Sequence, residues 1–170
     1  MSNVLFHWNL LPPDQAASEI LPCCGSRAWA QVLAGERPFQ EVAALLAASD
    51  RIWSGLSPDD WSEAFASHPR IGTTTSVGKS SAQSLAWSAR EQSDALTAAD
   101  SIKLALAEAN REYESKFRRI FITCATGKSA AEILENLQRR LNNEEPAEIL
   151  EAAEQQRQIT QLRLRKWLGE

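Results

Sequence analysis

His68 is the residue whose type and setting most directly suggest acid–base chemistry. It lies in the run Ser67-His68-Pro69-Arg70, where the proline disfavours helical geometry at the histidine and so places it at a helix end. Histidine is the side chain best suited to exchange a proton near neutral pH, and a helix C-terminus favours its protonated form. The run therefore suggests a general acid. A histidine that only caps a turn is the alternative, and the second histidine, His7, has no motif around it.

A second candidate is a polar face on an expected helix. Ser88, Glu91 and Gln92 are spaced three and four residues apart, so their side chains point the same way on a helix. They would offer a hydroxyl, a carboxylate and an amide to a small polar ligand. A solvated helix face has the same pattern, and that alternative stays open.

Residues 121–125 form a third candidate, because they are the core of the only β-like stretch in the chain. One isolated strand cannot make a sheet, so we expect an extended or irregular segment over residues 118–125. Irregular backbone leaves N–H and C=O groups that need partners, and a heterocycle with urea-like groups would satisfy them. An ordinary buried connector, satisfied by neighbouring helices, is the alternative. Gly127 and Lys128 follow without the glycine-rich loop of a phosphate site, so no nucleotide site is expected.

Arg163 is a fourth candidate near the end of the chain. It lies between Leu162 and Leu164, so its position borders the apolar face of an expected helix. An arginine there could reach into a pocket and hold a carboxylate through two hydrogen bonds. The alternative is a cationic last turn that complements the helix dipole, which is our interpretation of Arg165 and Lys166.

An all-α fold of about seven or eight helices is expected to position these groups. Hydrophobic periodicity and start and stop signals predict helices over residues 12–21, 27–33, 39–53, 58–67, 82–94, 98–117, 129–140 and 146–167. Residues 71–81 are rich in Gly, Thr and Ser and are expected to form a loop. Two helix starts are specific: Ser57 and Pro58 precede two acids, and Ser129 with Glu132 forms a capping box.

Length and charge narrow the classes of function. A chain of 170 residues fits a single domain over residues 1–170 and can bury a core without a disulfide or metal. Eighteen basic and 22 acidic residues give a formal net charge of −4, which favours neither nucleic acid nor an anionic membrane surface as a partner. Cys23, Cys24 and Cys124 lack metal or redox spacing and are expected to be buried structural residues. No signal peptide or membrane span is evident, so a cytoplasmic location is expected.

Read in order, the motifs resemble those of OHCU decarboxylases, enzymes that act on 2-oxo-4-hydroxy-4-carboxy-5-ureidoimidazoline (OHCU) in urate breakdown. The motifs that carry the resemblance cover nearly the whole chain and are Pro22-Cys23-Cys24-Gly25-Ser26, Arg37-Pro38-Phe39, His68-Pro69-Arg70-Ile71-Gly72, Ser88-x-x-Glu91-Gln92, Asn110-x-x-Tyr113-x-x-Lys116-Phe117, Phe121-Ile122-Thr123-Cys124-Ala125-Thr126-Gly127-Lys128, Arg139-Arg140-Leu141-Asn142-Asn143 and Ile159-Thr160-x-Leu162-Arg163-Leu164. None of them is decisive alone.

The resemblance implies an all-helical homodimer that converts OHCU into (S)-allantoin and carbon dioxide without a metal or other cofactor. It implies that His68 donates a proton. From the chemistry of the reaction, we expect Glu91 to orient His68 or the 4-hydroxyl group. The substrate-contacting residues that the resemblance implies are Pro69, Ser88, Ala89, Arg90, Glu91, Gln92, Phe121, Ile122, Thr123, Cys124, Ala125 and Arg163.

The chain departs from the family pattern at two backbone positions. The family often has glycine after the Lys/Arg-Phe pair, where this chain has Arg118, and glycine shortly after Glu-Gln, where it has Ser93 and Asp94. These departures affect local geometry and leave the reactive groups in place. A non-catalytic helical ligand-binding or interaction module remains an alternative function, as does an enzyme of a neighbouring ureide step.

Overall fold

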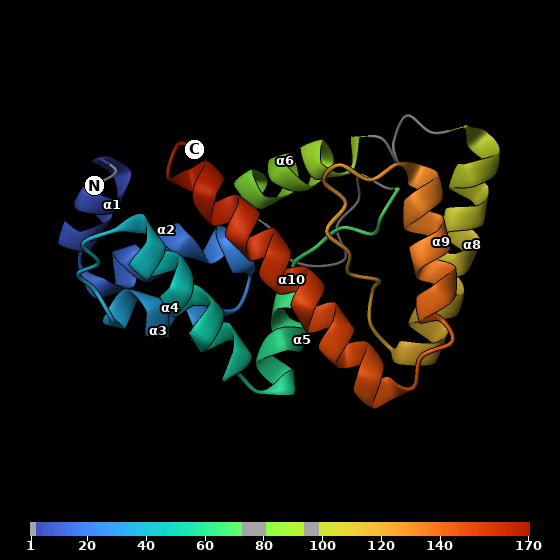
Figure 1. Ribbon diagram of the computed structural model, residues 1–170, viewed down its shortest axis with the longest axis horizontal. Coiled ribbons are helices and arrows are strands. Elements are labelled where there is room, and N and C mark those ends of the chain that lie inside the picture. Colours follow the sequence, from blue (N-terminus) through green and yellow to red (C-terminus); the bar gives the residue numbers. More distant parts are fainter. Residues whose placement is uncertain (1–2, 73–80, 94–98) are drawn as a thin grey trace. The chain divides into compact units, whose positions relative to one another are not determined.

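The computed structural model describes residues 3–72, 81–93 and 99–170 of the chain (Figure 1). Within these ranges the chain forms nine helices and no strand. The helices are α1 (Asn3–Leu10), α2 (Pro13–Cys24), α3 (Arg27–Gly35), α4 (Val42–Ser54), α5 (Pro58–Ala66), α6 (Ala82–Glu91), α8 (Asp100–Phe117), α9 (Ala130–Arg140) and α10 (Glu145–Trp167). The all-α prediction is confirmed. None of these helices is long and apolar enough to cross a bilayer.

The helices belong to two compact units. The N-terminal unit comprises Met1–Ala64 together with Arg157–Glu170, and the central unit comprises Phe65–Gln156. Helix α10 contributes its first part to the central unit and its last part to the N-terminal unit. The expected single domain stays a prediction, because a compact unit need not be an independent domain.

Helix α1 was not among the helices expected from the sequence. It has only eight residues, so its formation depends on tertiary contacts more than on its own periodicity. Leu5 and Trp8 are fully buried, and the indole Nε1 of Trp8 donates to the Ala16 carbonyl at 2.9 Å. Arg37 donates to the Trp8 carbonyl at 2.5 Å, which satisfies an acceptor at the end of the helix.

Several helix boundaries differ from the expected ones, and those of α2 and α4 have a clear structural reason. Helix α2 continues past Leu21, through Pro22, to Cys24, and ends where Gly25 adopts a left-handed conformation with φ 93°. Helix α4 begins at Val42 rather than at Phe39, because the Phe39 backbone is engaged elsewhere. Its N–H donates to Asn9 Oδ1 at 3.0 Å and its carbonyl accepts from Asn9 Nδ2 at 2.8 Å.

The start signals of α5 and α9 are confirmed. The Ser57 hydroxyl accepts from the Asp60 N–H at 3.3 Å, and α5 ends at Ala66, close to the expected Ser67. Ser129 and Glu132 form the expected capping box at the start of α9. The hydrogen bonds from the Ser129 hydroxyl and N–H lower the pKa of Glu132. The expected loop over residues 71–81 falls largely on residues 73–80, outside the described ranges. Helix α6 ends at Glu91, before the expected end near Asp94, because Gln92 leaves the helical conformation and caps it.

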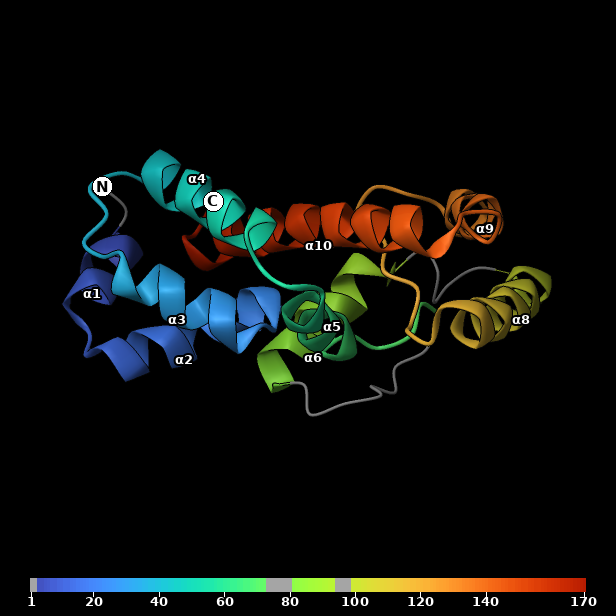
Figure 2. The same cartoon turned by 90° about the horizontal axis from the view of Figure 1, so that it is seen from below.

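The central unit is organised around α8 and α9, which lie side by side in both views (Figures 1 and 2). Residues 118–129 return from the end of α8 to the start of α9, and residues 120–125 do so without helical structure, as expected. The core of the unit consists of Ile71, Leu106, Ala109, Tyr113, Phe117, Phe121, Ala125, Ala130, Ile133 and Leu137. The irregular segment is therefore part of the core and is held from several sides.

The departure from family glycine at Arg118 has a structural cost. Arg118 closes α8 with φ 57°, a left-handed conformation in which a Cβ is disfavoured. We expect Arg118→Gly to raise the free energy of unfolding by about 1 kcal/mol in urea titrations. The matched control is Arg111→Gly, at an exposed position inside α8, which should lower the stability by about 1 kcal/mol. Equal losses from both substitutions would contradict this account.

The two adjacent cysteines predict a pH dependence of stability. Cys23 and Cys24 are buried, as expected, and burial raises the pKa of both thiols, that of Cys24 to about 12. Because the unfolded chain ionises these thiols near pH 9.0, their contribution is complete below that pH and is lost above it. We expect the free energy of unfolding to fall between pH 9 and 11 by up to about 1.4 kcal/mol per thiol and pH unit. A C23A/C24A variant should show a shallower slope, and an unchanged slope would exclude the cysteines as its cause.

Candidate active site

His68 is buried and fixed by a residue far away in the sequence. His68 lies just beyond the end of α5, and its backbone N–H donates to the Phe65 carbonyl at 3.1 Å. The ring Nε2 lies 2.7 Å from Oε1 of Gln156 on α10, and the histidine is only 6% exposed. A carbonyl oxygen accepts, so Nε2 carries the proton in this arrangement. A histidine that only caps a turn would need neither this burial nor a side-chain partner on a distant helix.

The residues after His68 are held by α8 and α6. Arg70 makes a double ion pair with Glu114, with Nε and Nη2 2.5 and 2.8 Å from the two carboxylate oxygens. The Ile71 carbonyl accepts from Asn110 Nδ2 at 3.4 Å. Pro69 and Ile71 are buried. The loop that carries His68 is therefore anchored on both sides of the histidine.

The polar face of α6 is only partly solvated. Ser88 and Gln92 are buried, Glu91 is half-buried, and Ala89 and Arg90 are exposed. Gln92 Oε1 accepts from the Gly72 N–H at 3.1 Å, which ties this face to the loop after His68. The structure thus places Ser88 and Gln92 inside the unit, a point that the spacing had left open, and it does not bring the side chains of Ala89 and Arg90 there.

Residues 121–125 are all buried and are tied to α10 and α9. Gln155 Oε1 accepts from the Cys124 N–H at 3.0 Å and from the Thr123 hydroxyl at 3.2 Å. The Cys124 carbonyl accepts from Lys128 Nζ at 2.8 Å. Both backbone polar groups of Cys124 are therefore engaged by neighbouring side chains, and its thiol is buried.

Two consecutive residues of α10 connect the candidate acid to this segment. Gln155 holds the backbone of Cys124, and Gln156 holds the ring of His68. Neighbouring residues of a helix point in different directions, so the two contacts leave α10 on different sides. Helix α10 is therefore a common support for two of the places that the sequence had singled out separately.

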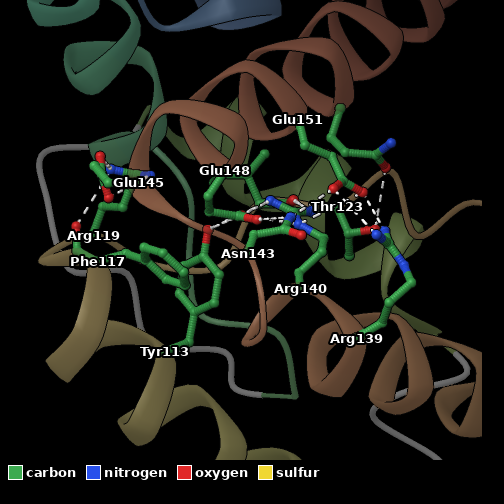
Figure 3. A network of polar contacts seen from close by, with 12 residues as sticks. Tyr113, Phe117, Arg119, Thr123, Arg139, Arg140, Asn143, Glu145, Glu148 and Glu151 are labelled. Carbon is green, nitrogen blue, oxygen red and sulfur yellow. Dashed lines mark hydrogen bonds and ion pairs between the residues drawn. The ribbon is translucent and has the colours of Figure 1, made fainter.

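A buried network around Arg140 also supports the segment (Figure 3). Arg140 and Glu148 are fully buried and form an ion pair, in which Arg140 Nε donates to Glu148 Oε1 at 2.9 Å. The Tyr113 hydroxyl donates to the same carboxylate oxygen, and Asn143 Nδ2 donates to the other at 2.7 Å. Burial raises the pKa of Tyr113, and its bond to the Glu148 carboxylate adds to the rise. Tyr113 therefore stays a neutral donor across the neutral pH range.

Arg163 is buried in the N-terminal unit, at 1% exposure. Its Nη1 lies 3.5 Å from the Pro22 carbonyl, and its charge lowers the pKa of Cys23 against the larger effect of burial. The interpretation of Arg163 as an exposed cation of the last turn is therefore wrong, whereas Arg165 and Lys166 are exposed as expected.

Sequence reasoning missed Gln155, Gln156 and the Arg140–Glu148 pair as parts of this site. A signal existed for Gln156, because the buried Ala152, Ala153, Ile159 and Thr160 are three or four residues away on the same helix. A polar residue at a core position marks a specific partner. Within the described ranges, no group of three or more His, Cys, Asp or Glu side chains could hold a metal ion.

Comparison with known proteins gives a consistent result. A family model described as OHCU decarboxylase matches residues 9–165. The chain is 39% identical, over 145 residues, to the uric acid degradation bifunctional protein TTL of Arabidopsis thaliana. The matched part covers 85% of this chain but 44% of that protein, so the chain spans less than half the length of this curated relative.

Two solved structures resemble the chain in fold. One, a crystal structure of OHCU decarboxylase in the presence of (S)-allantoin, has a TM-score of 0.77 and 32% identity, and the match covers 89% of this chain and 98% of that one. The other, a crystal structure of (S)-allantoin synthase, has a TM-score of 0.72 at 18% identity. It covers 96% of this chain and 53% of that one, and it supports the fold alone.

Proposed function

The chain belongs to the OHCU decarboxylase family, and on that premise we propose that it converts OHCU into (S)-allantoin and carbon dioxide. The observation that carries the proposal is the buried contact of His68 with Gln156, next to the residue that holds the Cys124 backbone. A buried histidine whose ring is oriented by a hydrogen bond suits a reaction that needs one proton delivered to one face of a planar intermediate.

The proposed reaction balances without a redox partner. The bond between C4 and the carboxylate breaks, carbon dioxide leaves, and the electron pair forms a double bond to the carbon that bears the ureido group. The adjacent imine and the 2-oxo group take up the charge. A proton is then added to the ureido-bearing carbon, the ring nitrogen gains a proton, and the 4-hydroxyl loses one as it becomes a carbonyl. Because the substrate supplies this electron sink, the proposed mechanism calls for no cofactor.

His68 is assigned the proton transfer and Gln156 the orientation of its ring. Ser88 and Gln92 are assigned to the ureido and ring amide groups, since both are buried and polar. Pro69 and residues 121–125 are assigned to the ring through contact and backbone groups. Ala89 and Arg90 are assigned to the substrate as the resemblance implies, and both are exposed in this structure.

Arg163 is assigned the anionic substrate, as the resemblance implies. A guanidinium matches a carboxylate in shape and charge. Too tight a grip on the departing carboxylate would stabilise the ground state and slow the reaction, so this contact should contribute mainly to substrate binding. The proposal therefore associates Arg163 with KM more than with kcat.

Glu91 is assigned the orientation of His68 or of the 4-hydroxyl group. We expect Glu91→Gln to lower kcat/KM about tenfold, because an amide keeps the shape but loses a charge-assisted hydrogen bond. Steady-state decarboxylation kinetics of the two proteins measure this. A kcat/KM equal to that of the unmodified protein would make Glu91 a structural acid.

The function is tested by coupled circular dichroism. Urate, urate oxidase and hydroxyisourate hydrolase generate OHCU in the cuvette, and addition of the purified protein should accelerate the appearance of the (S)-allantoin signal. An unchanged time course favours a non-catalytic module. Loss of OHCU without (S)-allantoin favours an enzyme of a neighbouring ureide step.

A homodimer and a cytoplasmic location complete the proposal. A small-molecule substrate, without a nucleic acid or membrane partner, is the partner class it names. The family resemblance supports the dimer, and the formal charge of −4 supports the absence of a polyanionic partner. Light scattering at micromolar concentration distinguishes a dimer from a monomer.

A further inference from the structure

The Ile122 carbonyl accepts a hydrogen bond from a buried cation. Arg140 Nη1 donates to this oxygen at 2.6 Å, from a guanidinium that is fully buried. The guanidinium also lies over the Phe121 ring, 4.6 Å from its centre. Its other nitrogens face Glu148 and the Tyr113 hydroxyl, so its orientation is over-determined (Figure 3).

The N–H of the same peptide unit belongs to Thr123. The peptide is trans, so this N–H points away from the carbonyl and from Arg140. Thr123 is 4% exposed, and its hydroxyl donates to Gln155. Among the residues that the structure describes, no acceptor is found for the Thr123 N–H. A buried N–H without an acceptor costs free energy, and it is a donor that remains available for charge that develops on a bound substrate.

The hydrogen bond from Arg140 to the Ile122 carbonyl makes the N–H at the other end of the peptide, that of Thr123, a stronger donor. Hydrogen bonds along one amide polarise one another, so a cationic donor at the Ile122 oxygen makes the Thr123 N–H a better donor. The Arg140–Glu148 pair carries no net charge, so the effect is local and depends on the fixed 2.6 Å contact. A donor held this way needs no reorganisation when charge develops opposite it.

We propose that Arg140 is a positioning residue that orients and polarises the Ile122–Thr123 peptide, so that the Thr123 N–H stabilises the charge that develops on the substrate's ring oxygen. The proposal rests on the proposed decarboxylation. When the C4–carboxylate bond breaks, the electron pair moves into the imine and the 2-oxo group, and the Thr123 N–H is the donor assigned to that oxygen. Because this charge is absent in the ground state, Arg140 should act on kcat rather than on KM.

The test uses two variants that remove the hydrogen bond from Arg140 to the Ile122 carbonyl and preserve the fold. Arg140→Met alone leaves Glu148 buried without its partner, so R140M/E148L replaces both charges with apolar side chains of similar size. Arg140→Lys keeps the positive charge but lacks the fork that reaches both Glu148 and Ile122. We expect kcat to fall about 100-fold in both, with KM changed less than threefold, since small misplacements of catalytic groups cost about that much. The matched control is Arg139→Met, at the neighbouring position of α9, which removes a half-exposed pair with Glu151 of α10 and should retain its kcat.

A measurement independent of turnover separates this proposal from the proposed function. In ¹⁵N-labelled protein, loss of the donor at the Ile122 carbonyl should move the Thr123 amide nitrogen resonance upfield in both variants but not in R139M. A folded R140M/E148L or R140K protein whose kcat stays within twofold of the unmodified protein overturns the proposal, as does an unmoved Thr123 resonance. If the unmodified protein has no activity on OHCU, the proposed function fails, while the resonance still reports whether Arg140 grips the peptide.

Discussion

We expect replacement of His68 by asparagine to lower kcat/KM for OHCU about 10³-fold. Asparagine is polar and smaller than histidine, but it has no proton to give or take near neutral pH, and general acid catalysis contributes about 10²–10⁴-fold. His68 is buried, with Nε2 against Gln156 at 2.7 Å, and the only other histidine in the sequence is His7. Residual turnover should yield allantoin with less excess of the (S) form, because the delivered proton sets the chirality.

His7 provides the matched control for this substitution. Its Nδ1 lies 2.7 Å from the Asn3 carbonyl of the same helix, and the side chain is exposed on α1. His7→Asn should leave kcat/KM and the chirality of the product unchanged. Unchanged turnover and chirality in the His68 variant would remove His68 from the mechanism. Equal losses in both variants would point to instability instead.

The second large effect is on stability. We expect Arg140→Met to lower the free energy of unfolding by about 4 kcal/mol, because it leaves the Glu148 carboxylate fully buried without its cation. The Ile122 carbonyl and the Tyr113 hydroxyl would each also lose a hydrogen bond that Arg140 donates. Urea unfolding followed by tryptophan fluorescence measures this loss.

The double variant makes this prediction specific. Removing both charges in R140M/E148L should cost at least 2 kcal/mol less than Arg140→Met alone, since apolar side chains often replace a buried pair with little loss. The Arg139→Met control, at a half-exposed pair, should cost less than about 1 kcal/mol. Additive losses along the cycle would mean that the two residues do not depend on each other.

Local chemistry explains why part of this molecule could be predicted. Pro69 fixes where a helix must stop, and Ser129 with Glu132 fixes where another begins, because a cap acts within four residues. The same is true of the face of α6, where the spacing of Ser88 and Gln92 predicted that they share a direction, and burial of both agrees.

What could not be predicted depends on contacts between distant parts of the chain. Gln156 and His68 are 88 residues apart, and nothing near either residue in the sequence indicates the other. Helix α1 forms because Trp8 and Leu5 are buried by partners elsewhere. Phe39 is non-helical because Asn9, 30 residues away, binds its backbone. Arg118 was visible as a departure from family glycine, but its positive φ required the structure.

The fate of a labelled carboxylate tests the central claim most directly. OHCU that carries ¹³C in its carboxylate is mixed with the purified protein, and ¹³C NMR follows the label while circular dichroism follows the product. The account predicts that the protein accelerates release of the label as carbon dioxide and bicarbonate, in step with an equal amount of (S)-allantoin. Label that stays on the substrate, or leaves at the rate of the protein-free solution to give racemic allantoin, would contradict it.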